Sequence, residues 1–327
     1  MLARRIGHGL AALVCGLAAA LAGAASYVPH EQVQGDVRIW GSPEDAGLVK
    51  LWADGFQARQ PGARVTAALH GPESTIACLY TDMGDIAFIG RELRLPVENM
   101  AFQWVKLYAL TTVQVANAGN AAQRLAGNVA VFVHPGNPVA GLTLEQLDGI
   151  FGAEHKRGGR NLRTWGELGL TGAWRDRPID AKAPAVDSIT SIFFRRTVLQ
   201  DSFKWNASMQ EFPTEAAAVA AVARDPGAIA FARMANGRAG VRALPLAAGA
   251  GQPFVPLTKE SAIDRTYPLA RSVIVAIDRK PGQPLDPKVR EFLRYVVSDD
   301  GQAAVAREGS YLPLDAAEQQ RVAEQLD

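Results

Sequence analysis

Cysteine is scarce in this chain of 327 residues, which contains only Cys15 and Cys78. Cys15 falls within a short apolar segment near the N-terminus that we expect to be removed, so the mature chain has no intramolecular disulfide. The neighbours Ile76, Ala77 and Leu79 predict that the Cys78 thiol is buried and behaves as a small apolar group. An exported chain of this length can bury a sizeable core without a disulfide.

The chain also lacks an excess of charge of either sign. It has 34 lysines and arginines against 33 aspartates and glutamates, a formal net charge of +1. Residues 1–25 contain two arginines and no acidic residue, so their removal leaves 34 − 2 = 32 basic residues against 33 acidic ones, a balance of −1. Such a balance provides no electrostatic footprint for nucleic acid, so we exclude nucleic acid as a partner.

No apolar run is long enough to span a membrane. The apolar segment at residues 10–21 follows the basic residues Arg4 and Arg5 and precedes four small residues at 22–25. This order is typical of a secretory signal peptide. We therefore predict that residues 1–25 are a signal peptide, that the mature chain begins near Ser26, and that the protein is periplasmic or secreted. A retained N-terminal anchor helix is the alternative, which the small residues disfavour.

Motifs for catalysis are missing as well. The sequence has no P-loop, no G-x-S-x-G turn and no paired C-x-x-C. The histidines of the mature chain lack the spacing of metal ligands, and only His70, close to Glu73, is a weak candidate for a metal site. We therefore expect no enzyme activity, no cofactor and no bound metal.

Short apolar segments rich in β-branched residues alternate with amphipathic ones along the chain, which predicts an α/β fold. The predicted strands are 37–40, 65–69, 86–89, 107–115, 129–133, 228–231 and 271–277. The predicted helices are 45–60, 74–80, 144–152, 214–224 and 287–298. We expect Trp165 and Trp174 to be packing residues.

The helix predicted at 144–152 has well-defined ends. Thr143 can cap its first turn, and Gln146 stands three residues further on, where a capping-box partner belongs. Leu147 and Ile150 fall on the same face, and Gly152 suits the C-terminal cap.

Several segments, in this order, resemble the phosphate-binding proteins of the Pst-type ABC importer. None of the segments is specific alone, but their order and spacing cover nearly all of the mature chain. They are Gly41-Ser42, Asp85-Ile86 with Arg91, Leu144 to Gly152, Thr164 to Gly169, Asp187 to Phe194, Gly227 to Phe231, Tyr267 to Arg271, Ser298 to Gln302 and Gly309 to Leu314.

The resemblance implies the two-lobed periplasmic-binding-protein fold of type II, in which each lobe is a mixed sheet flanked by helices. We place lobe I at residues 27–117 plus 241–327 and lobe II at 118–240. The implied function is binding of phosphate or another small oxyanion in the cleft between the lobes, with an ABC importer permease as the partner. The alternative is a sensor or interaction protein on the same fold that has lost tight phosphate binding.

The resemblance also assigns the ligand groups, which in this family are hydroxyls, an arginine and a carboxylate that accepts the phosphate proton. Asp85 matches the carboxylate. The full set of predicted ligand residues is Ser42, Ser74, Thr75, Asp85, Arg91, Ser188, Thr190 and Ser191.

The ligand loops depart from the family pattern at several positions. Pro43, Glu44 and Asp45 follow Ser42, Glu73 precedes Ser74, Gly90 precedes Arg91, and Ile189 and Ser191 replace a glycine and an arginine. Residues 42–45 are also typical of an ordinary helix start, with a cap, a proline and two acids.

A carboxylate about 5 Å from a bound anion costs on the order of 3 kcal/mol at an effective dielectric constant of about 20. Micromolar affinity corresponds to only about 8 kcal/mol. We therefore expect Glu44, Asp45 and Glu73 to weaken phosphate binding.

Overall fold

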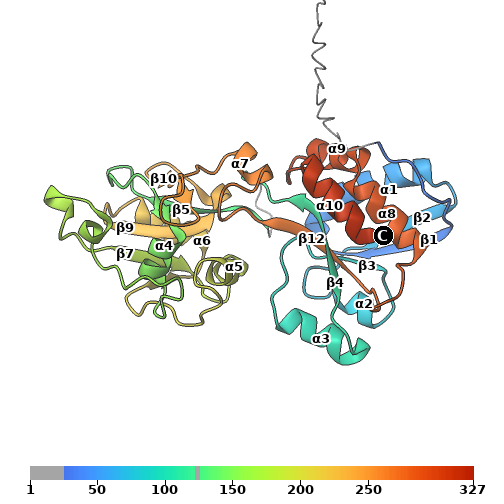
Figure 1. Ribbon diagram of the computed structural model, residues 1–327, viewed down its shortest axis with the longest axis horizontal. Coiled ribbons are helices and arrows are strands. Elements are labelled where there is room, and N and C mark those ends of the chain that lie inside the picture. Colours follow the sequence, from blue (N-terminus) through green and yellow to red (C-terminus); the bar gives the residue numbers. More distant parts are fainter. Residues whose placement is uncertain (1–25, 122–125) are drawn as a thin grey trace, which may run out of the picture.

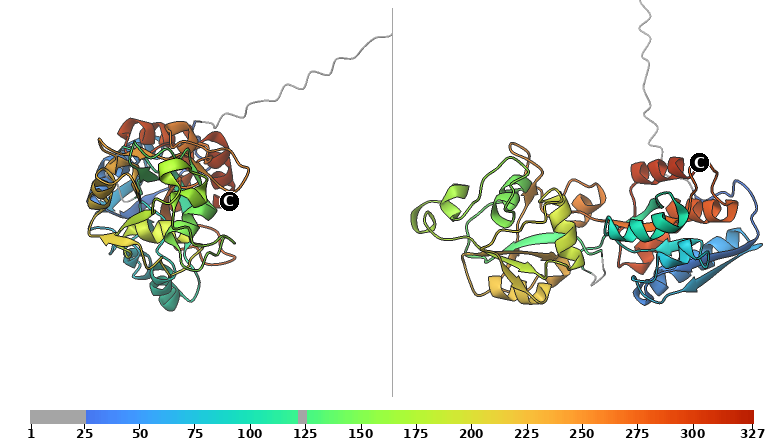
Figure 2. Two further views of the ribbon diagram at one scale, coloured as in Figure 1. Left: turned by 90° about the vertical axis from the view of Figure 1, so that its left-hand side faces the viewer. Right: turned by 90° about the horizontal axis from the view of Figure 1, so that it is seen from below.

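The chain forms two lobes that lie end to end and are joined by extended segments (Figures 1 and 2). The computed structural model describes residues 26–121 and 126–327, so the predicted signal peptide and Cys15 lie outside the described residues. Each lobe is built on a five-stranded mixed sheet covered by helices on both faces. The predicted fold class is confirmed.

The sheet of lobe I combines parallel and antiparallel neighbours. In spatial order its strands are β2 (Ala63–Ala68), β1 (Gly35–Trp40), β3 (Ile86–Phe88), β12 (Ser272–Ile277) and β4 (Thr111–Asn117). β1 runs parallel to β2 and β3, whereas β12 runs antiparallel to β3 and β4. The carboxyl ends of β1 and β3 therefore lie at the same edge of the sheet.

Side chains alternate across this sheet and give lobe I two cores. Ile86 and Phe88 pack on one face against Trp52, Phe56 and the C-terminal helices. The other face carries Ala87, Ile89, Cys78 and Phe102. The helices of the first face are α1 (Ala46–Arg59), α8 (Pro287–Val297), α9 (Asp299–Glu308) and α10 (Ala316–Leu326), and those of the second are α2 (Ala77–Tyr80) and α3 (Val97–Lys106).

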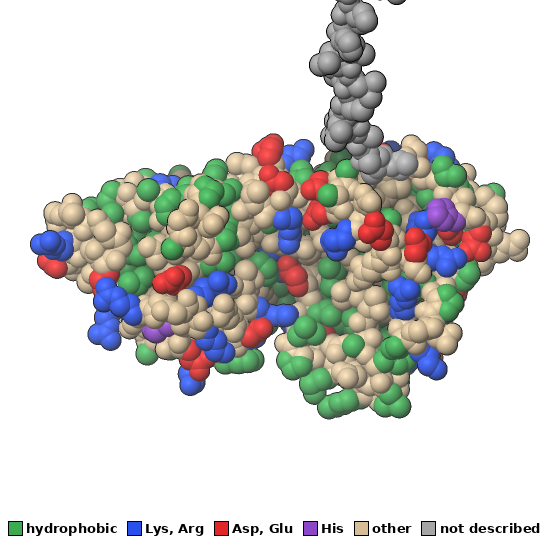
Figure 3. Space-filling model, in the orientation of Figure 1, with side chains coloured by type: hydrophobic (Ala, Val, Ile, Leu, Met, Phe, Trp, Pro, Cys, Tyr) green, Lys and Arg blue, Asp and Glu red, His purple; other side chains and the backbone are tan. Residues whose placement is uncertain are grey.

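Helix α3 was not predicted. The strand expected at 107–115 begins only at Thr111, because α3 precedes it and ends in a left-handed residue, Leu107. The outer face of α3 exposes Val97 and Trp104, whose exposed fractions are 70% and 73%. Hydrophobic side chains gather on this lower edge of lobe I in Figure 3.

Lobe II repeats the plan of lobe I. In spatial order its strands are β10 (Arg242–Ala243), β5 (Val129–Val133), β9 (Ala228–Arg233), β7 (Asp180–Pro184) and β8 (Gln210–Phe212), with a separate pair β11 (Leu246–Ala247) and β6 (Leu142–Thr143). Its α-helices are α4 (Leu144–Phe151), α5 (Ile189–Thr197), α6 (Glu215–Val222) and α7 (Lys259–Ile263). Short 3-10 turns lie at Trp165–Leu168, Gly172–Trp174 and Met234–Asn236.

The core of lobe II is aromatic. Phe194 from α5 stacks on Phe231 from β9 with a ring-centre distance of 3.9 Å, and Phe151 from α4 meets both rings edge-on. Trp165 is fully buried and contacts Trp174, so both tryptophans pack as predicted. This packing fixes α4 and α5 on one face of the sheet.

The capping box at the start of α4 is confirmed, since Thr143 and Gln146 hydrogen-bond each other's backbone N–H groups. Gly152 ends the helix, but in an extended conformation with φ −94° rather than a left-handed one. A Cβ at this position would lie 2.4 Å from the Asp148 carboxylate. Close approach, not a left-handed turn, therefore requires the glycine.

The chain crosses between the lobes on neighbouring strands. β4 ends at Asn117 and β5 begins at Val129, while the return falls at Arg271, just before β12. This return lies later than the expected boundary at 240/241. Residues 241–270 belong with lobe II because β10 pairs with β5, and because Leu246 and Tyr267 pack into its core.

Within the described residues, none of the helices is long and apolar enough to cross a membrane.

Candidate functional site

Lobe I brings two predicted ligand segments to one edge of its sheet. Ser42 follows β1, and Gly90 and Arg91 follow β3, so both segments lie where parallel strands end. Gly90 has φ +69°, and a Cβ there would lie 3.4 Å from both Asp45 Oδ2 and the Tyr311 hydroxyl. Asp45 therefore lies next to Gly90 at this edge.

Asp45 is a buried carboxylate, 2% exposed, at the start of α1. The Tyr311 hydroxyl donates a hydrogen bond of 2.8 Å to its Oδ1 atom. Ser42 does not cap the helix start but donates to Glu44 Oε1 at 3.4 Å. The edge of lobe I that was predicted to hold an anion therefore carries carboxylates that accept hydrogen bonds from its hydroxyls.

Arg91 is almost fully buried and forms an ion pair with Glu98 from α3. Its two terminal nitrogens donate to the two carboxylate oxygens at 3.0 and 2.6 Å. Glu98 also accepts from the backbone N–H and the Nε of Arg94. Burial alone raises the pKa of Glu98, but hydrogen bonds and positive charge from Arg91 and Arg94 hold it below its usual range. The buried Arg91 Nε has no hydrogen-bond partner.

The loop between β2 and α2 directs its polar side chains toward its own backbone. Ser74 and Thr75 both donate to the carbonyl oxygen of Gly71, at 3.1 and 2.9 Å. Glu73 is 74% exposed and pairs with Arg94 at 2.6 Å. Glu73 thus differs from the buried Asp45, although the sequence grouped these carboxylates together.

The structure does not bring Asp85 to this edge. Asp85 precedes β3 and therefore lies at the opposite end of the strand from Gly90 and Arg91. Arg38 donates to both of its oxygens, and Lys288 lies 3.6 Å away. Burial raises the pKa of Asp85, but the hydrogen bonds from Arg38 and the charge of Lys288 lower it overall. Asp85 thus acts here as a structural partner of Arg38.

Lobe II brings its three predicted ligand residues to the first turn of α5. Ser188 caps the helix by accepting from the Ser191 N–H at 3.2 Å. The Thr190 hydroxyl donates to Glu215 at 2.7 Å, and the Ser191 hydroxyl donates to the carbonyl of Pro184 at 3.2 Å. Thr190 and Ser191 are buried, so they fix the helix start in place.

Glu215, at the start of α6, was not singled out from the sequence. It accepts hydrogen bonds from the Thr190 hydroxyl, from the backbone and Nε of Arg233, and from the Asn236 amide. The only signal available was an acid directly after a capping residue, Thr214, which is typical of any helix start.

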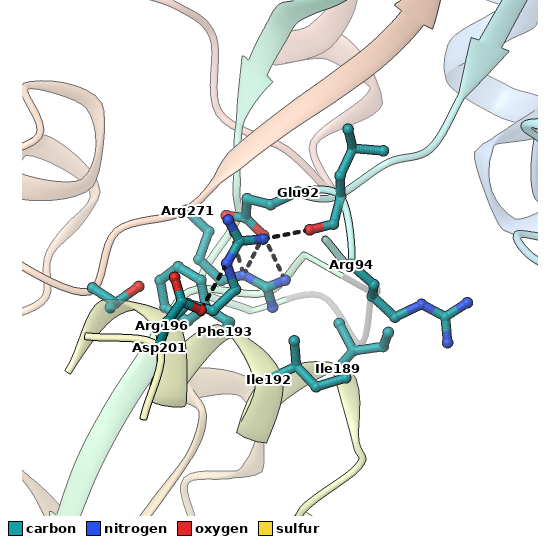
Figure 4. Close-up of a pocket in the computed structure, with 10 residues that line it drawn as sticks. Glu92, Arg94, Ile189, Ile192, Phe193, Arg196, Asp201 and Arg271 are labelled. Atoms are coloured by element: carbon teal, nitrogen blue, oxygen red, sulfur yellow. Dashed lines mark hydrogen bonds and ion pairs between the residues drawn. The ribbon is translucent and has the colours of Figure 1, made fainter. Parts of the chain in front are cut away.

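A pocket of about 280 Å³ lies between the two lobes (Figure 4). Its lining includes loop 92–94 from lobe I, one face of α5 from lobe II, and Arg271 at the return crossing. Arg271 pairs with Glu92 at 2.8 Å and stacks over the Phe193 ring at 4.7 Å. Arg196 donates to the carbonyl of Leu93 at 2.7 Å, which links the lobes directly. None of the eight predicted ligand residues lines this pocket.

In residues 26–121 and 126–327, no group of three or more histidine, cysteine, aspartate or glutamate side chains is placed to hold a metal ion. His70 packs its ring edge-on against Trp40 at a centroid distance of 5.4 Å. The Cys78 thiol is fully buried, and burial raises its pKa to about 12. Both side chains therefore pack within lobe I.

Two α/β lobes joined by paired crossing strands, with helix starts and a pocket at their junction, define a two-lobed solute-binding protein. The PBP superfamily domain matches residues 28–300. The phosphate-binding protein PstS of Pseudomonas aeruginosa is 30% identical over 317 residues, covering 95% of this chain and 94% of the relative. Protein SphX of Synechococcus elongatus is 23% identical over 268 residues, covering 81% and 73%.

Solved structures share the fold. An ABC-type phosphate transport receptor from Vibrio cholerae has a TM-score of 0.54 at 20% identity and covers 84% of this chain and 99% of its own. PstS from Borrelia burgdorferi has a TM-score of 0.56 at 16% identity and covers 87% and 100%. The chain belongs to the PstS family of phosphate-binding proteins within the PBP superfamily.

Proposed function

We propose that the protein is an exported solute-binding component of a phosphate-type ABC importer, and that it binds a small oxyanion between its lobes. It would work in the periplasm, deliver the anion to the permease of the importer, and catalyse no reaction. The observation that carries this proposal is the 30% identity to PstS of P. aeruginosa across 95% of the chain. A likeness of that extent includes both lobes and both crossings.

The positions of Ser42 and Ser188 support the proposal. Each residue follows a strand and begins a helical segment, one in each lobe. The N–H groups of a first helical turn are oriented toward an anion, and the helix dipole favours negative charge there. Closure of the lobes would bring these two segments to the same ligand.

Calorimetry of the exported protein tests the proposal. Inorganic phosphate, arsenate, sulfate and nitrate are titrated into the wild type and into two alanine variants. Ser188→Ala removes the capping hydroxyl at the start of α5 and should weaken anion binding. Ser208→Ala is the matched control, because Ser208 is an exposed serine of lobe II that bonds Asn206. Failure of every anion to bind would contradict the proposal.

Small-angle scattering adds an independent measurement. Closing of the lobes around the anion that binds should reduce the radius of gyration, because the two lobes lie end to end in the structure. An anion that bound tightly without any change in radius would argue against hinge closure.

A further inference from the structure

We propose that the pocket between the lobes takes the organic part of an anion, so that the preferred ligand is a phosphoryl group attached to an apolar body. Phosphate monoesters and phosphonates share this chemistry. The inference rests on the proposed function, because the phosphoryl group would occupy the oxyanion position at the start of α5. It adds a second subsite, which the predicted ligand residues do not line.

The pocket follows one face of α5. Ile189, Ile192, Phe193, Arg196 and Thr197 line it, and their spacing of three, four, seven and eight residues from Ile189 places them on one side of a helix. The first turn of α5, capped by Ser188, lies at the Ile189 end of this face. An anion at the first turn would therefore have an apolar surface running away from it along the helix.

The size of the pocket exceeds what a bare oxyanion needs. Its volume is about 280 Å³. A site for one water molecule needs only about 10–15 Å³ on the same measure, so the pocket has room for a group larger than a bare oxyanion. The apolar part of the lining comes chiefly from α5, because the Leu93 side chain packs into the second core of lobe I and its carbonyl accepts from Arg196. An apolar body of the size of a phenyl ring would fit in this space and gain stability from buried apolar area.

The pocket lining itself carries a small excess of positive charge. Its lining includes Arg94, Arg196 and Arg271 against Glu92 and Asp201, a formal balance of 3 − 2 = +1. Arg271 pairs with Glu92, and Arg94 pairs with Glu73 and Glu98 outside the pocket. Arg196 makes its 2.7 Å bond to a backbone carbonyl, lies 3.5 Å from Asp201, and keeps 28% of its side chain exposed. Arg94 keeps a similar fraction, 31%, so Arg94 and Arg196 are the partly exposed cations of the lining, whereas Arg271 is 1% exposed.

Most of the predicted ligand hydroxyls already donate their hydrogen bonds within the protein. Ser74, Thr75 and Ser191 donate to backbone carbonyls, and Thr190 donates to Glu215. A hydroxyl that donates within the protein cannot donate the same hydrogen to an anion. These predicted ligand residues thus offer fewer hydrogen-bond donors to inorganic phosphate than the sequence suggests. Contacts between the pocket and an organic group would make up for the lost binding free energy.

Calorimetry with three probes tests this inference on the exported protein. Phenyl phosphate carries both parts of the ligand, inorganic phosphate only the anion, and benzyl alcohol only the apolar body. We expect phenyl phosphate to bind at least tenfold more tightly than inorganic phosphate and benzyl alcohol not to bind measurably. Equal or tighter binding of inorganic phosphate would overturn the inference and leave the proposed function standing. Failure of both phosphates to bind would also overturn the inference, and failure of arsenate, sulfate and nitrate as well would overturn the proposed function itself.

Variants of the pocket face test whether it causes the preference for phenyl phosphate. Ile192→Asp places a carboxylate on the pocket face of α5 and should abolish the preference for phenyl phosphate, while Ile192→Ala should reduce it. Val97→Asp is the matched control, because Val97 is an exposed apolar residue of α3 outside the pocket. It should leave the preference intact. Equal preferences in the wild type and both Ile192 variants would place the organic group elsewhere and overturn the inference.

Discussion

The two lobes differ in how the serine at the start of a helical segment is hydrogen-bonded. Each presents a helix start after a strand, but Ser42 in lobe I turns to Glu44, whereas Ser188 in lobe II caps its helix. Lobe I then buries the carboxylate of Asp45 beside Gly90, while lobe II continues into the apolar face of α5. The same two-lobed fold therefore presents negative charge on the lobe I side of the cleft and apolar surface on the lobe II side.

The lobes also differ in how they hold a carboxylate that is 10% exposed. In lobe I, Glu98 pairs with Arg91, whose side chain is 1% exposed. In lobe II, Glu215 pairs with Arg233, whose side chain is 22% exposed. Removing the partner of a charge costs less stability when that charge remains in contact with water. Replacing the glutamate of each pair with glutamine should therefore destabilise the two lobes unequally.

The largest effect is expected for Glu98→Gln. This change leaves the buried Arg91 guanidinium without its countercharge and should lower the free energy of unfolding by about 3–5 kcal/mol. Asp54→Asn is the control, because Asp54 forms an exposed pair with Lys50 and should cost less than about 1 kcal/mol. Urea denaturation measures both. A loss below about 1 kcal/mol for Glu98→Gln would mean that this pair adds little to lobe I.

A smaller loss is expected for Glu215→Gln in lobe II. The amide keeps one oxygen for the Thr190 hydroxyl and loses the charge that Arg233 faces, so we expect about 2 kcal/mol. Glu211→Gln is the matched control, since Glu211 is exposed and accepts only a 3.3 Å bond from the Val186 N–H. If Glu215→Gln destabilised the protein more than Glu98→Gln, the unequal burial of the two arginines would not explain the difference between lobes.

Acid should weaken lobe I through Glu98. The pKa of Glu98 is lower in the folded protein than its usual value, because Arg91 and Arg94 favour the charged form despite burial. The resulting stabilisation is present above the pKa of an unfolded glutamate, about 4.3, and is lost as the pH falls through the folded-state pKa. Urea midpoints measured between pH 7 and pH 3 should therefore fall less steeply in Glu98→Gln than in the wild type. Identical slopes would contradict this assignment.

The sequence predicts most of the fold because its signals are local. The capping box at Thr143, the end of α1 before Pro61 and the buried strand 129–133 each depend on neighbouring residues. The return crossing was misplaced because β10 is held in lobe II by pairing with β5, a contact that residue spacing does not encode. The position of α3 escaped prediction for a related reason, since tertiary packing of Phe102 and the pair with Arg91 help to fix it.

The candidate site was harder to predict than the fold. Motif order identified Ser42 and Ser188 as ligand positions, but it did not predict the helix that begins after Ser188 or the direction in which each hydroxyl or carboxylate points. Asp85 shows the difficulty, because its place in a family-like segment suggested a ligand, whereas its contacts with Arg38 are structural. The Glu92–Arg271 pair joins residues far apart in sequence, so only the fold brings them together.

The smallest predicted effect separates two carboxylates that the sequence treats alike. Asp45 is buried beside Gly90, whereas Glu73 is exposed and paired with Arg94. A carboxylate near the oxyanion opposes binding most strongly where water is excluded. Asp45→Asn removes this charge and keeps an oxygen that accepts the Tyr311 hydroxyl, so phosphate affinity should rise roughly tenfold, or about 1.4 kcal/mol.

Glu73→Gln is the matched control and should change phosphate affinity less than about twofold, because its charge is exposed and screened. Calorimetry with inorganic phosphate at pH 7 measures both variants against the wild type. Equal effects of the two substitutions would show that burial does not distinguish these carboxylates. If Asp45→Asn does not raise the affinity for phosphate, the anion does not bind near Gly90. The first turn of α5 in lobe II would then have to hold the anion without contacts from the edge of lobe I.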